Sequence, residues 1–179
     1  NNETIIAGSS CSQKKVSDFA MKNNISGFEF MYCIPGTIGG GIRMNSGCFG
    51  SEFKDNLISL QCIDHKGNIK IIPASDVNFK YRKIELQDNL IFLSATFKGE
   101  ISRQEKIKNL MDSLLRKKNN SQPSKIKTGG STFKNPIDQT SKKAWELIKE
   151  SIDHNINFGD ACISEKHVNF FVNKKNATF

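Results

Sequence analysis

Glycine is concentrated in residues 31–50, MYCIPGTIGGGIRMNSGCFG, a segment that contains no acidic side chain. Consecutive glycines allow successive backbone N–H groups to point into one concavity, where they can bind a pyrophosphate. The segment matches neither the GxGxxG fingerprint of dinucleotide-binding folds nor the lysine-containing phosphate loop of nucleotide-hydrolysing enzymes. Pro35–Gly36 also fits an ordinary type II turn. The local chemistry therefore leaves two interpretations open, a phosphate cradle and a tight connection.

Three further stretches combine residue types that can bind or react with a polar ligand. They are FKYRKIEL (79–86), KTGGSTFKNP (127–136) and ISEKHVNFFVN (163–173). In the second, Ser131 offers a hydroxyl, while Lys134 and Asn135 offer hydrogen-bond donors. Each stretch also has an ordinary interpretation. A pair such as Tyr81–Arg82 is typical of a protein surface, and a lone histidine such as His167 is usually packed or on the surface. None of them alone identifies a function.

Composition restricts the class of protein and of partner. The chain has 179 residues, of which 37% are hydrophobic and 25% charged, as in a soluble globular protein. The longest apolar runs, such as residues 90–93, are too short to cross a bilayer, so we expect no membrane partner. The net charge of +8 predicts affinity for anions. Much of this charge lies between Arg103 and Lys134, where it indicates either a solvated helix face or an anion-binding surface.

The cysteines and histidines favour neither disulfides nor a metal. The five cysteines are widely scattered and no two have the two-residue spacing of a zinc or redox motif, which predicts free thiols in a reducing compartment. The three histidines are equally dispersed, so we expect no metal site. They are His65, His154 and His167.

Periodicity predicts strands and one helix in the first part of the chain. The β-rich run 4–8 is a strand, and 57–63 with 69–73 forms a hairpin. Ser12 caps a helix whose apolar stripe contains Val16, Phe19 and Ala20. Residues 90–97 predict a central strand, because both faces of that run are largely apolar.

The character of the chain changes near residue 99. Ser102 and Glu105 have the spacing of a capping box, and a helix with an apolar face follows. That face consists of Ile107, Leu110, Met111, Leu114 and Leu115. A second helix is expected over 141–150, with Ala144, Trp145, Leu147 and Ile148 turned inward, and a strand over 167–173. We therefore predict two domains, residues 1–98 and 99–179.

Together, the four stretches are far more specific than any one of them. Their order and wording resemble the UDP-N-acetylenolpyruvoylglucosamine reductases, flavoenzymes that complete UDP-N-acetylmuramate synthesis for bacterial peptidoglycan. The resemblance covers nearly the whole chain. It is carried by GFEFMYCIPGTIGGGIRMNSGCFG (27–50), FKYR (79–82), QPSKIKTGGSTFKNP (122–136), AWELI (144–148) and SEKHVNFFVNKKNAT (164–178).

The resemblance implies an α+β fold. An FAD-binding α+β region, with a flavin domain of the PCMH/vanillyl-alcohol-oxidase type, precedes a smaller α+β substrate-binding domain. It also implies a cytoplasmic, monomeric oxidoreductase in which NADPH reduces FAD. The reduced flavin then passes a hydride to the enolpyruvyl group of UDP-N-acetylglucosamine enolpyruvate. By this route the protein serves peptidoglycan synthesis, and with it cell wall biogenesis, cell shape and cell division.

The same resemblance assigns roles to residues. Arg82 stabilises the charge that develops on the enolate, and Ser131 protonates the adjacent carbon, while Tyr81, Lys134 and Asn135 lie at the UDP-sugar. The predicted flavin-site residues come from the glycine-rich segment. They are Ile34, Pro35, Gly36, Thr37, Gly39, Gly40, Met44, Asn45 and Gly47.

Departures from the family pattern leave alternatives. The early glycine–serine segment of the family's FAD site is absent, its catalytic glutamate would follow Phe179, and Cys33 stands where a glycine is usual. These departures predict an internal fragment. The alternative function is a catalytically incomplete fragment that retains only UDP-sugar binding or partial flavin binding.

Two other functions are disfavoured. The motif GGSTFKNP argues against another flavin oxidoreductase of similar fold. Nucleic-acid binding is disfavoured because the chain has only one Trp, two Tyr and no recognised binding motif.

Overall fold

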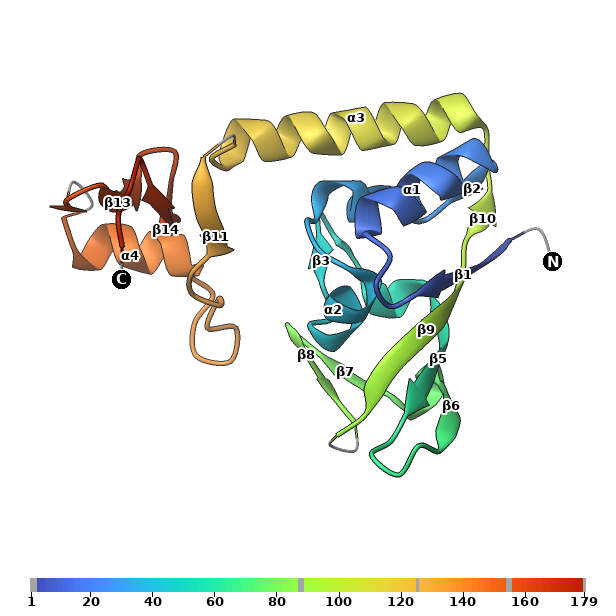
Figure 1. The fold of residues 1–179 in the computed structure, drawn as a ribbon. Coiled ribbons are helices and arrows are strands. Elements are labelled where there is room, and N and C mark those ends of the chain that lie inside the picture. Colours follow the sequence, from blue (N-terminus) through green and yellow to red (C-terminus); the bar gives the residue numbers. More distant parts are fainter. Residues whose placement is uncertain (1–2, 87–88, 125, 154–155, 179) are drawn as a thin grey trace. The chain divides into compact units, whose positions relative to one another are not determined.

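The computed structural model describes residues 3–86, 89–124, 126–153 and 156–178 (Figure 1). The chain divides into two compact units, residues 1–116 and 117–179. Each unit contains both helices and antiparallel strands, so the predicted α+β class is confirmed. The boundary between the two units falls within one long helix, and the domain boundary expected near residue 99 stays a prediction. No helix in the described ranges is long and apolar enough to span a bilayer.

A four-stranded antiparallel sheet organises the first unit (Figure 1). Its strand order is β1 (Thr4–Gly8), β9 (Ile91–Lys98), β5 (Leu57–Ile63), β6 (Ile69–Pro73). The predicted strands, the 57–73 hairpin and the internal position of β9 are all confirmed.

Only one face of β9 is covered, although both of its faces are largely apolar. Phe92 and Phe97 are buried, while Ile91 is 58% exposed. The outer face also carries Ile6 and Ile71, which are 73% and 70% exposed. The remaining elements of the unit are short. They are β2 (Ile25–Ser26), η1 (Glu29–Cys33), α2 (Ile38–Arg43), β3 (Gly47–Cys48), β4 (Ser51–Glu52), η2 (Phe53–Asp55), η3 (Ala74–Asp76), β7 (Asn78–Lys80), β8 (Lys83–Glu85) and β10 (Glu100–Ile101).

Helix α1 (Gln13–Lys22) begins where the sequence predicts, since the Ser12 hydroxyl accepts a hydrogen bond from Lys15 N–H at 3.3 Å. Its buried stripe contains the expected Val16 and Ala20. Phe19, however, is 54% exposed and was wrongly included. The stripe follows positions 13, 16, 17 and 20, so it contains two polar residues, Gln13 and Ser17.

Phenylalanine rings fill the core of the first unit. Phe53 and Phe97 are fully buried, and their centroids lie 5.9 Å apart with an interplanar angle of 68°. Phe30 packs edge-on against Phe53 at 5.9 Å, and Phe28 packs edge-on against Phe97 at 6.2 Å. Edge-to-face contacts of this kind stabilise beyond the area that they bury. Helix α2 packs on β1 and β9, which ties the glycine-rich segment to the sheet.

The second unit is a smaller antiparallel sheet with one helix. Its strand order is β11 (Lys127–Ser131), β14 (His167–Asn173), β13 (Ala161–Ser164), β12 (Asn157–Phe158). Helix α4 (Ala144–Ser151) packs against β14. The predicted strand 167–173 is confirmed. The predicted helix 141–150 begins three residues late, at Ala144, where the Glu146 carboxylate accepts the Lys143 N–H at 2.6 Å.

Helix α3 (Gln104–Ser121) is the long helix in which the units meet. Ile107, Met111 and Leu114 are buried, as the periodicity predicts. Leu110 is 46% exposed, so its assignment to the apolar face was wrong. The buried positions repeat at four and three residues, and Leu110 lies at the edge of that narrow stripe.

Candidate functional site

The glycine-rich segment is held to the start of α1 because residues 36–38 pair antiparallel with residues 11–13. Gln13 N–H donates to Gly36 O at 3.0 Å, and Ile38 N–H donates to Cys11 O at 2.8 Å. These two bonds flank the Ser12–Thr37 bridge, so the N–H of Thr37 itself points away from the pairing. Gly39 N–H adds a bond of 2.8 Å to Ser9 O. The segment is therefore a fixed part of the first unit.

Its backbone amides are arranged differently from a simple phosphate cradle. The N–H groups of Ile38 and Gly39 are used in the pairing just described. Gly40 N–H donates to the Thr37 hydroxyl at 3.2 Å, and Gly41 N–H donates to Thr37 O at 2.9 Å. Four successive amides thus donate within the protein. An anion at this segment would be bound by other donors, such as the outward N–H of Thr37.

The glycines themselves fall into two groups. A Cβ on Gly41 would lie 2.5 Å from Phe53, and one on Gly47 would lie 2.3 Å from Ser51 O. Gly39 faces Ser9 at 3.0 Å. These three glycines are explained by close packing within the protein. Gly36 and Gly40, by contrast, lie on the exposed side and would meet no atom nearer than 3.6 Å and 3.4 Å. Only this second group leaves room for a ligand against the backbone.

Asn45 is the buried anchor of the segment that follows α2. Its side chain is 1% exposed, and its φ is +37°. Nδ2 donates to the Glu52 carboxylate at 2.9 Å and to Lys80 O at 3.3 Å, while Oδ1 accepts from Lys54 N–H at 3.1 Å. Asn is among the few residues that tolerate a positive φ, and its amide satisfies three partners. Asn45 thus joins the loop to β4 and β7.

Arg82 docks on the same loop. It follows Tyr81 in the two-residue turn between β7 and β8, with a φ of +54°. Its Nη2 donates to Gly47 O at 2.6 Å and its Nη1 to Asn45 O at 3.4 Å. The guanidinium also lies 5.2 Å from the centre of the Tyr81 ring. The structure therefore brings Arg82 and Tyr81 together with two of the predicted flavin-site residues.

In the second unit, Ser131 ends β11 just after an irregularity. The β11–β14 register shifts between Thr128 and Ser131, and Gly130 has a φ of +90°. The Thr128 hydroxyl bridges the distortion, since it donates to Phe171 O at 2.6 Å and accepts from Gly130 N–H at 3.3 Å. Ser131 is exposed and faces Phe170 in the ladder. Bulges commonly redirect a side chain in this way next to active sites.

The other predicted residues of this unit occupy different surroundings. Lys134 is exposed, three residues beyond the end of β11. The Oδ1 of half-buried Asn135 accepts the N–H of Ala144, the first residue of α4, at 3.0 Å. His167 is packed against Phe170 with the ring centres 4.8 Å apart, and burial lowers its pKa. Its Nδ1 accepts the Asn169 N–H at 3.2 Å, so a packed histidine is what the structure contains.

Two residues that the sequence analysis missed fix the candidate site. Gln13, 2% exposed, donates from Nε2 to Thr37 O at 3.3 Å, while its Oε1 has no partner in the described residues. A polar residue on the apolar stripe of α1 was the available signal. Asn169, 4% exposed, hydrogen-bonds the segment after Ser131. No sequence pattern distinguishes it from other polar residues of the strand.

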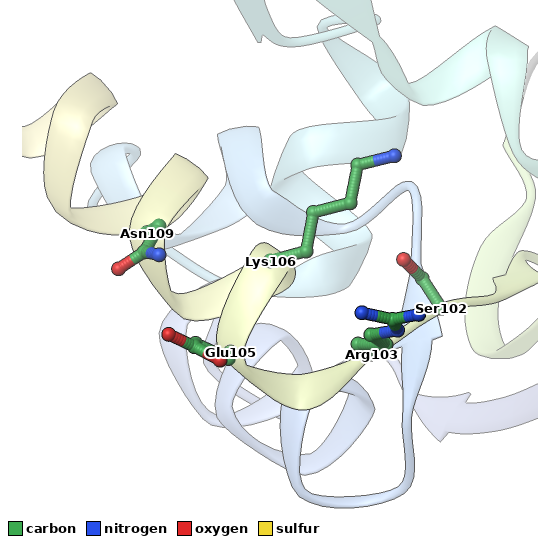
Figure 2. A pocket seen from close by; sticks show the side chains of 5 residues that line it. All are labelled: Ser102, Arg103, Glu105, Lys106 and Asn109. Carbon is green, nitrogen blue, oxygen red and sulfur yellow. The ribbon is translucent and has the colours of Figure 1, made fainter.

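The basic start of α3 forms an open hollow. It is lined by Ser102, Arg103, Glu105, Lys106 and Asn109. Figure 2 shows side chains of both charges around the first turn of the helix, and all but Ser102 are exposed. The exposure of these side chains is compatible with both interpretations of the basic stretch, a solvated helix face and an anion-binding surface. Within the described ranges no three His, Cys, Asp or Glu side chains gather to hold a metal ion, and His154 lies outside those ranges.

Comparison with known proteins identifies the relationship. Residues 1–72 match the family model described as FAD binding domain, and residues 122–179 match that of the C-terminal domain of UDP-N-acetylenolpyruvoylglucosamine reductase. The reductase of Pelagibacter ubique is 61% identical over 178 residues, covering 99% of this chain and 59% of the relative. Along nearly its whole length the chain is therefore similar to UDP-N-acetylenolpyruvoylglucosamine reductases.

Two further reductases show the same similarity. The protein of Rickettsia bellii is 44% identical over 97% of this chain and 57% of its own length. The crystal structure of the Thermus caldophilus reductase superposes with a TM-score of 0.86 at 29% identity, covering 99% of this chain and 64% of that one. The chain therefore spans about three fifths of the length of the curated relatives it matches.

The candidate flavin segment fits the cofactor expected of the reductase family. The prediction of FAD is confirmed at the level of the family match to residues 1–72. The open side of the segment presents Pro35, Gly36, Thr37, Gly40 and Met44, all exposed and uncharged. At Gly36 and Gly40 an added Cβ would make only ordinary contacts, at 3.6 Å to Gln13 Nε2 and 3.4 Å to Thr37 Oγ1. These residues suit the close approach of a flat, phosphate-bearing group.

Proposed function

We propose that this chain forms the catalytic part of a UDP-N-acetylenolpyruvoylglucosamine reductase, which reduces the enolpyruvyl group of the UDP-sugar to give UDP-N-acetylmuramate. The observation that carries the proposal is the docking of Arg82 on the carbonyls of Asn45 and Gly47. It joins the predicted catalytic cation to the predicted flavin loop within one compact unit. The names of the relatives support the same reaction.

FAD would be held by the exposed part of the glycine-rich segment. Gly36 and Gly40 let the cofactor approach the backbone, and Thr37 offers the outward N–H. When bound, FAD would carry a hydride from NADPH to the substrate. At Gly39 and Gly47 close packing within the protein leaves no room for a side chain. We therefore assign these two glycines to the predicted site through their neighbours. Asn45 acts there as the internal anchor of the loop.

Arg82 is suited to stabilise negative charge on the substrate. Hydride addition next to a carboxylate builds an enolate, and a guanidinium beside it lowers the barrier without losing its own proton. Two carbonyl acceptors and the Tyr81 ring fix the orientation of this group before any substrate arrives. A charge held in place costs no reorganisation during the reaction.

Ser131 is suited to donate a proton to the adjacent carbon. A serine hydroxyl is a very weak acid, so the transfer requires a strongly basic enolate held close to it. The bulge and the positive φ of Gly130 expose this hydroxyl at the end of β11. Lys134 and Asn135 would contact the oxygens of the UDP-sugar, where charged and amide donors bind phosphate and hydroxyl groups.

The wider assignments follow from the reaction. An enzyme of precursor synthesis acts in the cytoplasm, and we expect a monomer that serves peptidoglycan synthesis, cell shape and division. A second candidate is a chain that binds the UDP-sugar without reducing it. The division into two compact units favours it, because the second unit has its own sheet and helix. Calorimetric titration with the UDP-sugar, with and without FAD, separates the two candidates.

The test of the main proposal separates the two half-reactions in the protein that contains this chain. Ser131→Ala should leave flavin reduction by NADPH unchanged, but slow reoxidation by the enolpyruvyl substrate about 10²–10⁴-fold, the range for loss of a general acid. Ser124→Ala, at an exposed serine of the same unit, is the matched control. Equal slowing of both half-reactions contradicts the proton-donor role. Absence of any flavin spectrum with added FAD contradicts the reductase proposal itself.

A further inference from the structure

Asn169 is the one buried residue on its face of β14, where His167 and Asn173 are half-buried and Phe171 is exposed. Along β14, Val168, Phe170 and Val172 share one buried face, and the intervening residues point to the other. On that second face Phe171 is 48% exposed, whereas Asn169 is only 4% exposed. A polar side chain is buried at such a position only where it finds hydrogen-bond partners. The chain that covers it is the segment following Ser131.

The Asn169 amide clamps one residue of that segment on both sides. Its Oδ1 accepts the N–H of Phe133 at 3.0 Å, and its Nδ2 donates to the carbonyl of Phe133 at 2.9 Å. The backbone carbonyl of Asn169 accepts the N–H of Thr132 at 2.8 Å. Its own N–H donates to His167 Nδ1 at 3.2 Å. Every polar group of Asn169 is therefore used.

This clamp continues the sheet beyond the point where the strand ladder ends. The last β11–β14 pair joins Ser131 to Phe170. A carboxamide carries one donor side and one acceptor side, as a peptide group does, so the Asn169 side chain pairs with Phe133 as a neighbouring strand would. The Phe133 ring then lies edge-on to Phe171, with the centroids 6.4 Å apart.

We propose that Asn169 is a positioning residue, which through Phe133 fixes the backbone on which Ser131 and Lys134 are presented. The inference deepens the proposed function and rests on it for the roles of those two residues. The preceding bulge and the positive φ of Gly130 leave this stretch without a regular ladder. The amide of Asn169 supplies the missing constraint.

The same strand offers a matched control. Asn173, also on β14, clamps Ala177 with the same pair of bonds: its Oδ1 accepts Ala177 N–H at 3.1 Å and its Nδ2 donates to Ala177 O at 2.9 Å. Asn169→Asp and Asn173→Asp are isosteric changes. Each replaces the Nδ2 donor by a carboxylate oxygen, which then faces the carbonyl of Phe133 or of Ala177. Both variants lose one clamp bond, but only the first touches the segment after Ser131.

The first arm of the test is structural and requires no activity. In ¹⁵N spectra of the protein that contains this chain, Asn169→Asp should shift the Ser131 and Phe133 amides. It should also speed exchange of the Phe133 N–H by at least about tenfold, because the new carboxylate oxygen repels the Phe133 carbonyl and the clamp opens more often. Asn173→Asp should leave those two amides unchanged. The proposal is overturned where Asn169→Asp leaves the Ser131 and Phe133 signals at their wild-type positions.

The second arm measures the chemistry. Asn169→Asp should slow reoxidation of the flavin by the enolpyruvyl substrate about 10–100-fold and raise its solvent deuterium isotope effect, as loss of positioning costs on this scale. Reduction by NADPH should stay at the wild-type rate. Equal reoxidation rates in Asn169→Asp and Asn173→Asp overturn the positioning role. Failure of the wild-type protein to be reoxidised refutes the proposed function instead, and the amide signals then decide the role of Asn169.

Discussion

Two neighbouring glycines of α2 should respond in opposite directions to the same substitution. In Gly41→Ala the new Cβ would lie 2.5 and 2.6 Å from two atoms of the Phe53 ring and 2.9 Å from Gln13 Nε2. Carbon atoms in contact prefer about 3.5–4.0 Å, so the overlap with the ring is about 1 Å. Phe53 is fully buried between Phe30 and Phe97, and it has little room to retreat.

The size of the effect follows from two opposing terms. Overpacking of a core costs about 1–3 kcal/mol, and the enclosed ring places this site in the upper half of that range. Alanine in a helix gains about 0.5–1 kcal/mol over glycine. The net loss for Gly41→Ala is therefore about 2 kcal/mol, or roughly 8 °C in melting temperature for a unit of this size. In Gly40→Ala the nearest atom is Thr37 Oγ1 at 3.4 Å, so the gain of about 0.5–1 kcal/mol should remain.

The assay is urea unfolding followed by two probes. Circular dichroism reports on the whole chain, while fluorescence of Trp145, the single tryptophan, reports on the second unit. Gly41→Ala should lower the midpoint seen by circular dichroism and leave the Trp145 transition in place. In FAD titrations, Gly40→Ala should weaken binding despite its greater stability. A neutral Gly41→Ala together with a destabilising Gly40→Ala would refute the division of these glycines into packing and ligand-facing groups.

Three further outcomes are expected. Arg82→Lys should slow flavin reoxidation by the substrate about 10²-fold or more, since a single ammonium cannot reproduce the docked guanidinium, and an unchanged rate contradicts its role. The Asp64 carboxylate accepts bonds from the backbone and side chain of Asn68, which lower its pKa to about 2. Because the pKa of Asp64 is lower in the folded than in the unfolded chain, its ionised carboxylate stabilises the fold above pH 4, and this stabilisation is lost as the pH falls towards 2. In Asp64→Asn the free energy of unfolding should therefore depend less on pH in that window. Of the thiols, exposed Cys11 should react with a disulfide reagent in the native protein, while Cys62, whose pKa burial raises, should react only on unfolding.

The sequence predicts the framework of this protein well, because hydrophobic periodicity depends on the chain alone. The strands 4–8, 57–63, 69–73 and 167–173 appear where alternation places them. Its errors concern which side is covered. Phe19 and Leu110 are apolar yet exposed, since burial depends on what packs above each element. Periodicity reports the pattern of an element but contains no information about its neighbours.

The residues of the candidate site were predicted from sequence motifs, but the contacts that hold them in place were not. Motif resemblance selects Arg82 and the glycine-rich segment, but the 2.6 Å bond from Arg82 to Gly47 O joins residues 35 positions apart. Nothing local in the sequence encodes that pairing. The phosphate-cradle argument likewise treats all glycines alike. Only the structure separates Gly41, where a Cβ would overlap the Phe53 ring, from Gly40, where it would make an ordinary contact.

Both units fix their candidate site segments with buried carboxamides. Asn45 holds the loop on which Arg82 docks, and Asn169 holds the segment after Ser131. These segments carry positive φ angles or a bulge, which a regular ladder of backbone bonds does not accommodate. A carboxamide has the donor and the acceptor of a peptide group on a short side chain, so it can satisfy irregular backbone from beside it. Irregular geometry presents the side chains that we propose to be reactive, and the buried amides hold that geometry in place.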